Sequence, residues 1–137
     1  MPYATQADME ARFGVDELTQ LTDRVGAGVP DAAIVARSLA DADAEIDGYL
    51  ATRYALPLAT VPSMLARIAC DIARYRLWED RASEEVRRRY EDARRILESI
   101  AKGMVSLGLP EANAAPALAS VTLGNERVMT RDGTGGY

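Results

Sequence analysis

The sequence predicts an all-α fold: a small helical bundle of three long helices, preceded by one or two short N-terminal helices and followed by an extended C-terminal arm. Three segments between residues 31 and 103 carry apolar residues every three or four positions. This is the period of a helix that buries one side. The period is absent after residue 104. We therefore expect a helical body over residues 1–104 and an arm over residues 105–137.

Two short helices are expected near the N-terminus. Thr5 can cap a helix over residues 6–13, because Asp8 stands at the third helical position and completes a capping box. Asp16 can cap a second short helix over residues 17–22. A glycine-rich loop closed by a proline then leads to the long helices.

The long helices are expected over residues 31–54, 63–80 and 83–103. Asp31 begins the first and Ser83 caps the third, and both are residue types that favour helix N-termini. Two prolines enclose the turn between the first and the second of these helices. Each helix therefore has a signal in the sequence for at least one of its ends.

The helix over residues 63–80 is apolar on two opposite faces. Such a helix is sandwiched between other elements. Either it forms the centre of the fold, or one of its faces meets a neighbouring subunit. We take the face with smaller side chains as a candidate partner interface, since small side chains allow close approach. One face contains Met64, Leu65, Ile68, Ile72 and Tyr75, and the candidate interface contains Ala66, Cys70, Ala73 and Leu77.

Composition argues against several classes of function. The net charge of −5 does not favour binding to nucleic acid through phosphate neutralisation. Histidine, the commonest general base and metal ligand, is absent from the sequence. Cys70 is the single cysteine, so neither a disulfide within the chain nor a thiolate zinc site can form. We therefore expect no catalytic residues, no metal and no cofactor, and we do not expect an enzyme.

Membrane insertion is not expected either. No apolar run approaches the roughly 20 residues that span a bilayer. The N-terminus lacks the basic and apolar regions of a signal peptide. The expectation is synthesis inside the cell, with no membrane partner.

Two charged segments imitate binding motifs. Residues 43–48 resemble the start of a calcium loop, but the twelfth position is Tyr54 rather than glutamate, so a solvated acidic helix face is favoured. The arginines of residues 87–95 resemble a nucleic-acid patch, but acidic residues precede them by four positions, which favours a salt-bridged exposed helix. The expected pairs are Glu84–Arg88, Glu85–Arg89 and Glu91–Arg95.

Asp71 borders an apolar face of the helix over residues 63–80, with Arg67 and Arg74 one turn away on either side. A half-buried carboxylate without a partner is energetically costly. We therefore predict a structural ion pair among Arg67, Asp71 and Arg74. A catalytic role is not favoured, because no second carboxylate is placed beside Asp71.

Sequence blocks along nearly the whole chain resemble a family of uncharacterised proteins encoded among the head genes of Mu-like phages and prophages. The blocks occur in order, and several are five or more residues long, which makes the resemblance specific. They are YAT at 3–5, RFG at 12–14, ELTQLTD at 17–23, ADAEIDGYL at 42–50, RYALPL at 53–58, CDIARY at 70–75, RYEDA at 89–93 and RVMTRD at 127–132.

The resemblance implies a structural role. The family is similar in size and helical make-up to the connector, or adaptor, proteins of long-tailed phages. Those proteins form rings under the portal protein, dock through C-terminal arms, and join the head to the stopper or tail. We therefore expect this protein to be a component of the virion neck that is synthesised in the host cytoplasm. We expect it to form a homo-oligomeric ring of about twelve copies, a dodecamer. DNA would pass through the ring without specific binding.

The arm carries the other candidate interface residues. Residues 121–129 can form a short β-hairpin around a Gly-Asn pair, and such a hairpin needs another surface for stability. Two other functions stay open: a tail-completion or stopper protein of the neck, and a DNA-binding packaging accessory factor. The candidate interface residues of the arm are Arg127, Val128, Met129, Arg131 and Tyr137.

Overall fold

The computed structural model describes residues 2–112 of the chain. Over this range the chain forms α-helices and one 3₁₀ turn, and no β-strand, which confirms the predicted all-α fold. The helices are α1 (Gln6–Phe13), α2 (Val15–Thr22), α3 (Ala32–Leu50), α4 (Ser63–Trp78) and α5 (Glu84–Ala101), with the 3₁₀ turn at Glu79–Arg81.

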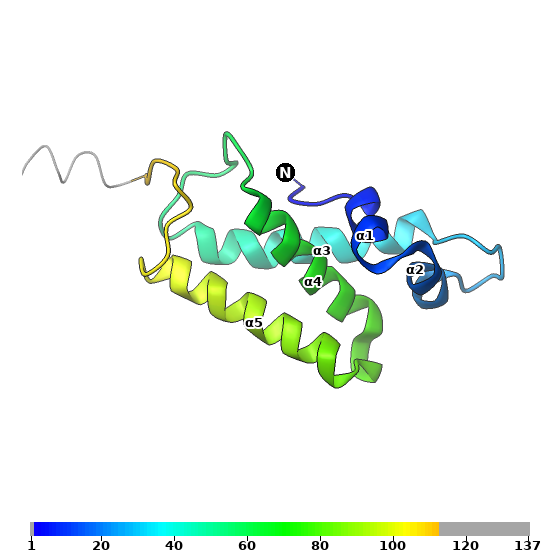
Figure 1. Cartoon of the computed structure of the whole chain (residues 1–137). Helices are drawn as coiled ribbons and strands as arrows, with labels where there is room; N and C mark the ends of the chain where they lie inside the picture. The colour runs from blue at the N-terminus through cyan, green and yellow to red at the C-terminus, as the bar shows by residue number, and fades with distance from the viewer. Residues whose placement is uncertain (1, 113–137) are drawn as a thin grey trace, which may run out of the picture.

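Helix α4 is the centre of the bundle (Figure 1). It contacts α3 and α5 along its length, while α1 and α2 pack beside α3 and α4 towards one end of the molecule. The segment that follows α5 lies at the opposite end, where α3 also finishes. Both faces of α4 are consequently apolar and buried. Its buried apolar residues are Leu65, Ile68, Ala69, Cys70, Ile72, Ala73 and Leu77.

The small-residue face of α4 is internal. Cys70 and Ala73 are fully buried and Leu77 is 6% exposed, all within the core of this single chain. A neighbouring subunit cannot reach them there, so this placement corrects their assignment to a partner interface. Of the two arrangements that the sequence allowed for this helix, the structure shows the first: α4 is the centre of the fold, and its small-residue face does not meet a neighbouring subunit. Ala66 is only half-buried and stays a candidate for contact with a partner.

The expected caps are present at three helices. The Thr5 hydroxyl accepts the backbone N–H of Asp8 at 3.3 Å, and the Asp8 carboxylate accepts the N–H of Thr5 at 2.9 Å, which completes the predicted capping box. The side chains of Asp31 and Ser83 accept N–H groups in the first turns of α3 and α5. These bonds satisfy donors that have no partner within the helix.

Helix boundaries differ from expectation at three places. Asp16 lies inside the first turn of α2 and does not cap it, because the helix begins at Val15, two residues before the expected start. Helix α3 ends earlier than expected, since the N–H of Arg53 donates to the Leu50 carbonyl oxygen in a three-residue turn at 3.0 Å. Helix α4 ends before Glu79, whose φ of 55° does not continue a right-handed helix.

The N-terminal segment belongs to the core, which the sequence patterns did not indicate. Tyr3 is 4% exposed, and its N–H donates to Asp43 at 3.1 Å. Its hydroxyl donates to the carboxylate of Asp47. Burial, and then the hydrogen bond to Asp47, raise the pKa of Tyr3 well above its ordinary value. The acidic face of α3, expected to be solvated, therefore holds the N-terminus.

Residues 105–112, which we expected to begin the arm, lie against the body. The N–H of Leu107 donates to the Tyr54 hydroxyl at 3.1 Å. The body therefore extends through residue 112, while the arm residues 113–137 and the expected hairpin lie outside the described range. The half-buried side chains that pack on the core from this segment are Val105, Leu107 and Leu109.

Candidate functional site

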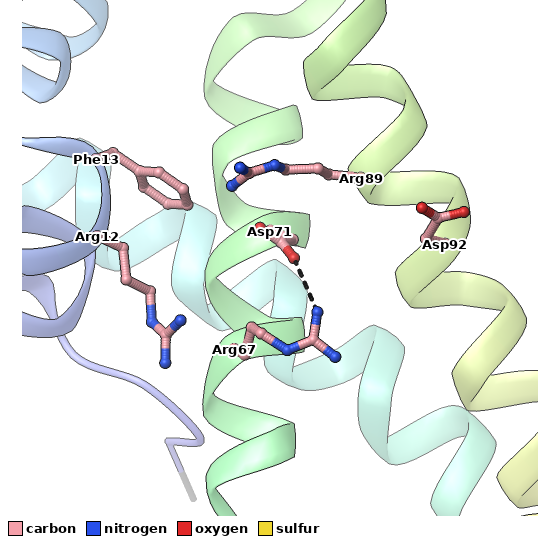
Figure 2. Close-up of a pocket in the computed structure, with 6 residues that line it drawn as sticks. All are labelled: Arg12, Phe13, Arg67, Asp71, Arg89 and Asp92. Atoms are coloured by element: carbon pink, nitrogen blue, oxygen red, sulfur yellow. Dashed lines mark ion pairs between the residues drawn. The ribbon is translucent and has the colours of Figure 1, made fainter.

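A polar pocket of about 410 Å³ lies where α1, α4 and α5 meet, and it is the main candidate site. Each of these helices contributes one arginine to it (Figure 2). The Arg89 guanidinium extends across from α5 towards Asp71, while Arg67 reaches the same carboxylate from one turn away on α4. The lining residues are Arg12, Phe13, Arg67, Asp71, Arg89 and Asp92.

Asp71 is the buried group of this pocket. Its side chain is 7% exposed, and its Oδ2 lies 4.0 Å from Nη1 of Arg67. The expected ion pair between Arg67 and Asp71 is thus present, but it is longer than a hydrogen bond. Burial raises the pKa of Asp71, and the positive charges of Arg89 and Arg67 oppose that rise.

Arg74 does not complete this ion pair, contrary to expectation. Its Nε and Nη2 donate to the two carboxylate oxygens of Glu17 at 2.7 and 3.0 Å. The indole N–H of Trp78 also donates to Glu17, at 3.3 Å. The guanidinium of Arg74 lies 4.5 Å from the centre of the Phe13 ring. Arg74 therefore joins α4 to α1 and α2, because a well-oriented carboxylate on α2 is a closer partner than Asp71.

The arginines of α5 are salt-bridged to acidic residues, although not always to the expected ones. Glu85 and Arg89 pair at 3.5 Å as predicted. The other two expected pairs are replaced by pairs three residues apart, between Glu84 and Arg87 and between Asp92 and Arg95. Positions three and four residues apart are both neighbours on a helix surface, so the sequence does not decide between them.

Arg53, just after α3, anchors the segment that follows α5. Its Nη1 donates to the carbonyl oxygens of Ile100 and Val105, at 2.6 and 3.1 Å, and its Nε donates to Glu111 at 3.1 Å. The carbonyl oxygen of Arg53 accepts the N–H of Ala112 at 2.9 Å. Arg53 thus binds a carbonyl oxygen in the last turn of α5 and another in the segment that follows the helix.

Cys70 is not placed for chemistry. It is fully buried, and burial raises the pKa of its thiol to about 11. The reactive thiolate is therefore scarce at neutral pH. Within residues 2–112 no group of three or more histidine, cysteine or acidic side chains could hold a metal ion. None of the helices in that range is long and apolar enough to cross a membrane.

Sequence patterns did not identify the pocket, because its arginines come from three separate helices. The Arg-Phe-Gly block at residues 12–14 contains two of the lining residues, but it gives no indication of what they face. Arg53 was also not singled out as an anchor. The candidate interface residues of the arm lie outside the described range, and their role stays a prediction. They are Arg127, Val128, Met129, Arg131 and Tyr137.

The fold and the site define a small all-α protein with an arginine-lined pocket and an anchored C-terminal segment. Residues 3–123 match the model of the family described as Bacteriophage Mu, Gp36. The chain belongs to this family, which confirms the resemblance to proteins of Mu-like phages and prophages.

Two relatives are similar over most of their length. The Mu-like prophage FluMu protein gp36 of Haemophilus influenzae is 43% identical over 109 residues, which cover 80% of this chain and 77% of the relative. Gene product J of Escherichia phage Mu is 41% identical over 116 residues, covering 84% and 82% of the two chains. The chain is therefore similar to these proteins over about four fifths of its length.

Proposed function

We propose that this protein is a structural head–tail connector, or adaptor, of a Mu-like phage or prophage. In this role it forms a homo-oligomeric ring of about twelve copies in the virion neck, between the portal protein and the stopper or tail-terminator protein. Membership of the Gp36 family and the small all-α body support the proposal. Synthesis takes place in the host cytoplasm, before assembly.

The observation that carries the proposal is the anchoring of the chain after α5. Residues 105–112 are bound at the end of the body away from α1 and α2. Residues 113–137 therefore start from a defined point, and a chain of this length can reach at most roughly 90 Å. That reach is sufficient for contact with an adjacent copy or with a different protein of the neck.

A closed ring with head-to-tail contacts requires two different surfaces on each copy. The end of the body that carries residues 105–112 and the end that carries α1 and α2 are two such surfaces. Half-buried Ala66 is a further candidate for these contacts. In the arm, we assign contacts with other chains to Arg127, Val128, Met129, Arg131 and Tyr137.

The proposed ring is a passage for DNA and does not bind it specifically. The chain is acidic overall, with a net charge of −5. Several arginines of α5 are paired with acidic neighbours, so their charge is partly compensated. The proposed role requires neither a cofactor nor catalysis.

Light scattering of the purified full-length protein, alone and mixed with its portal protein, tests the proposal. We expect a ring-sized complex with the portal. Met129→Asp should abolish that complex while leaving the helical circular dichroism unchanged. Met104→Asp is the matched control, because Met104 is 76% exposed at the end of the body, and it should retain the complex.

Three outcomes would contradict the adaptor role. A protein that stays monomeric and never joins the portal would remove it. Binding to the stopper or tail-terminator protein without the portal would assign the chain a position lower in the neck. Tight binding to duplex DNA that weakens steeply with salt would favour the packaging-factor alternative.

A further inference from the structure

The pocket between α1, α4 and α5 contains a buried carboxylate that lacks a hydrogen-bond donor. Within the part of the chain that the structure describes, Asp71 accepts no hydrogen bond, and its nearest ion-pair partner is Arg67 at 4.0 Å. Its side chain is 93% buried, since 7% is exposed, and it lines the pocket. Buried polar groups in native proteins normally have partners. Asp71 therefore marks a site that is built for polar contacts.

The three arginines offer more donors than Asp71 can use. Three guanidinium groups carry about fifteen N–H donors, whereas one carboxylate accepts about four hydrogen bonds. Among residues 2–112, Arg89 has one ion pair, with exposed Glu85 at 3.5 Å, and Arg12 has none. The side chains of Arg67 and Arg89 are 48% and 50% exposed, so their outer donors are accessible.

The formal charge of the pocket lining and the apolar wall beside it indicate which class of ligand the pocket can bind. The lining contains three arginines and two aspartates, a formal charge of +1 that a single carboxylate neutralises. Arginine donors bind a carboxylate in two-pronged geometry. Phe13 supplies an apolar wall and is fixed by the Arg74 guanidinium 4.5 Å from the centre of its ring. A carboxylate on a short aliphatic stem matches both features.

Other ligand classes match the pocket less well. A metal cation would be repelled by the three guanidinium groups. A phosphate dianion would exceed the formal charge of +1 that the lining carries. Duplex DNA presents its phosphates on a broad convex backbone, and the chain as a whole carries a charge of −5.

We propose that this pocket receives an aspartate or glutamate side chain from a partner protein, with Arg12, Arg67 and Arg89 as the groups that bind its carboxylate. Asp71, which lies 4.0 Å from Nη1 of Arg67, is a positioning residue for that arginine. This inference goes beyond the connector role. Only the identity of the partner, a protein of the phage neck that carries the acidic residue, rests on that proposed function.

Titration of the ¹⁵N-labelled full-length protein, followed by nuclear magnetic resonance, tests the proposal. The probes are a short blocked peptide with two glutamates, the same peptide with glutamines, inorganic phosphate, and a short DNA duplex. We expect the glutamate peptide alone to shift the amide signals of Arg12, Phe13, Asp71 and Arg89. Because the isolated protein is used, the result is independent of portal binding.

Variants then connect the binding to the arginines. Arg12→Gln and Arg89→Gln should each weaken binding of the glutamate peptide about tenfold, as expected for loss of one charge-assisted hydrogen bond. Arg88→Gln is the matched control, since Arg88 is exposed on α5 but does not line the pocket, and it should leave binding unchanged. The melting temperatures of all three variants report whether each is folded.

Each contrary result overturns the proposal. Equal shifts with the glutamine peptide would show that the carboxylate is not recognised. Stronger shifts with phosphate or with duplex DNA at the same amides would assign the pocket to a phosphate group. If Arg88→Gln weakened binding of the glutamate peptide as much as Arg89→Gln, the peptide would be bound by general charge attraction and not by the pocket.

Discussion

Arg53 and Glu111 form a two-pronged ion pair although 58 residues separate them in the sequence. Their side chains are 14% and 33% exposed, so the pair is partly shielded from water. The hydrogen bonds with Glu111 raise the pKa of Arg53 and lower that of Glu111. This pair fixes residue 111 beside the end of α3, and the remaining chain continues from there.

Arg53→Gln should release the segment that this pair holds. The substitution removes the contact with Glu111 and two hydrogen bonds to carbonyl oxygens near the end of α5. We expect amide hydrogen exchange over residues 105–112 to accelerate about tenfold or more, with the core of α4 unchanged. Exchange measured by mass spectrometry on the full-length protein provides this comparison.

Two further variants define what the anchor requires. Arg53→Lys keeps the charge but not the planar fork, so it should give an intermediate increase. Arg37→Gln removes an exposed arginine of α3 away from the anchor and should have no effect on residues 105–112. Unaltered exchange in Arg53→Gln would mean that apolar packing alone holds the segment.

Local signals in the sequence were sufficient to predict much of the fold. The capping box of Thr5 and Asp8, and the cap at Ser83, involve residues within one helical turn, so the pattern alone identifies them. The period of apolar residues likewise gave the three long helices. Their exact ends were less predictable, because the chain reversal at Glu79 depends on a backbone conformation rather than on residue type.

Side-chain partners could not be predicted where they come from distant segments. Arg74 was expected beside Asp71, one helical turn away, but it binds Glu17, which is 57 residues distant in the sequence. Burial of Cys70 could be predicted, but whether another helix of the same chain or a second copy covers that face could not. The arginine pocket needs the mutual placement of three helices, which no local pattern contains.

Arg74→Gln should destabilise the protein by about 2–3 kcal/mol. The pair with Glu17 is largely buried, with side chains 11% and 22% exposed, and its loss leaves a buried carboxylate with only the Trp78 indole as donor. Urea denaturation followed by circular dichroism measures the free energy of unfolding.

An exposed ion pair provides the contrast. Glu85→Gln breaks the contact with Arg89, in which the side chains are 61% and 50% exposed, and should cost less than about 0.5 kcal/mol. Similar losses from the Glu85 and Arg74 substitutions would show that burial does not determine the strength of these pairs.

Asp71→Asn should change how stability depends on pH. Burial raises the pKa of Asp71 in the folded state above its ordinary value of 3.8. The folded protein therefore binds this proton more tightly, and the resulting stability is present below pH 3.8 and lost as the pH rises through the folded-state pKa. Asparagine does not titrate, so the stability of the variant relative to the wild type should increase from pH 4 to pH 7.

Urea denaturation of both proteins at a series of pH values measures this difference. The wild type and Asp71→Asn carry the same other titrating groups, so their contributions cancel to first order. A difference in free energy that stays constant across the series would mean that the surrounding arginines offset the burial of Asp71 completely.

Cys70 should react with a thiol reagent only when the protein unfolds. The side chain is fully buried, and its thiol pKa of about 11 lies above the ordinary 9.0. The pKa difference alone lowers the thiolate fraction at pH 8 about a hundredfold, and burial slows access further. Labelling with an aromatic disulfide reagent, with and without urea, compares the two states. Rapid labelling of the folded protein would show that the small-residue face of α4 opens to solvent, which would restore the possibility that a second copy covers it.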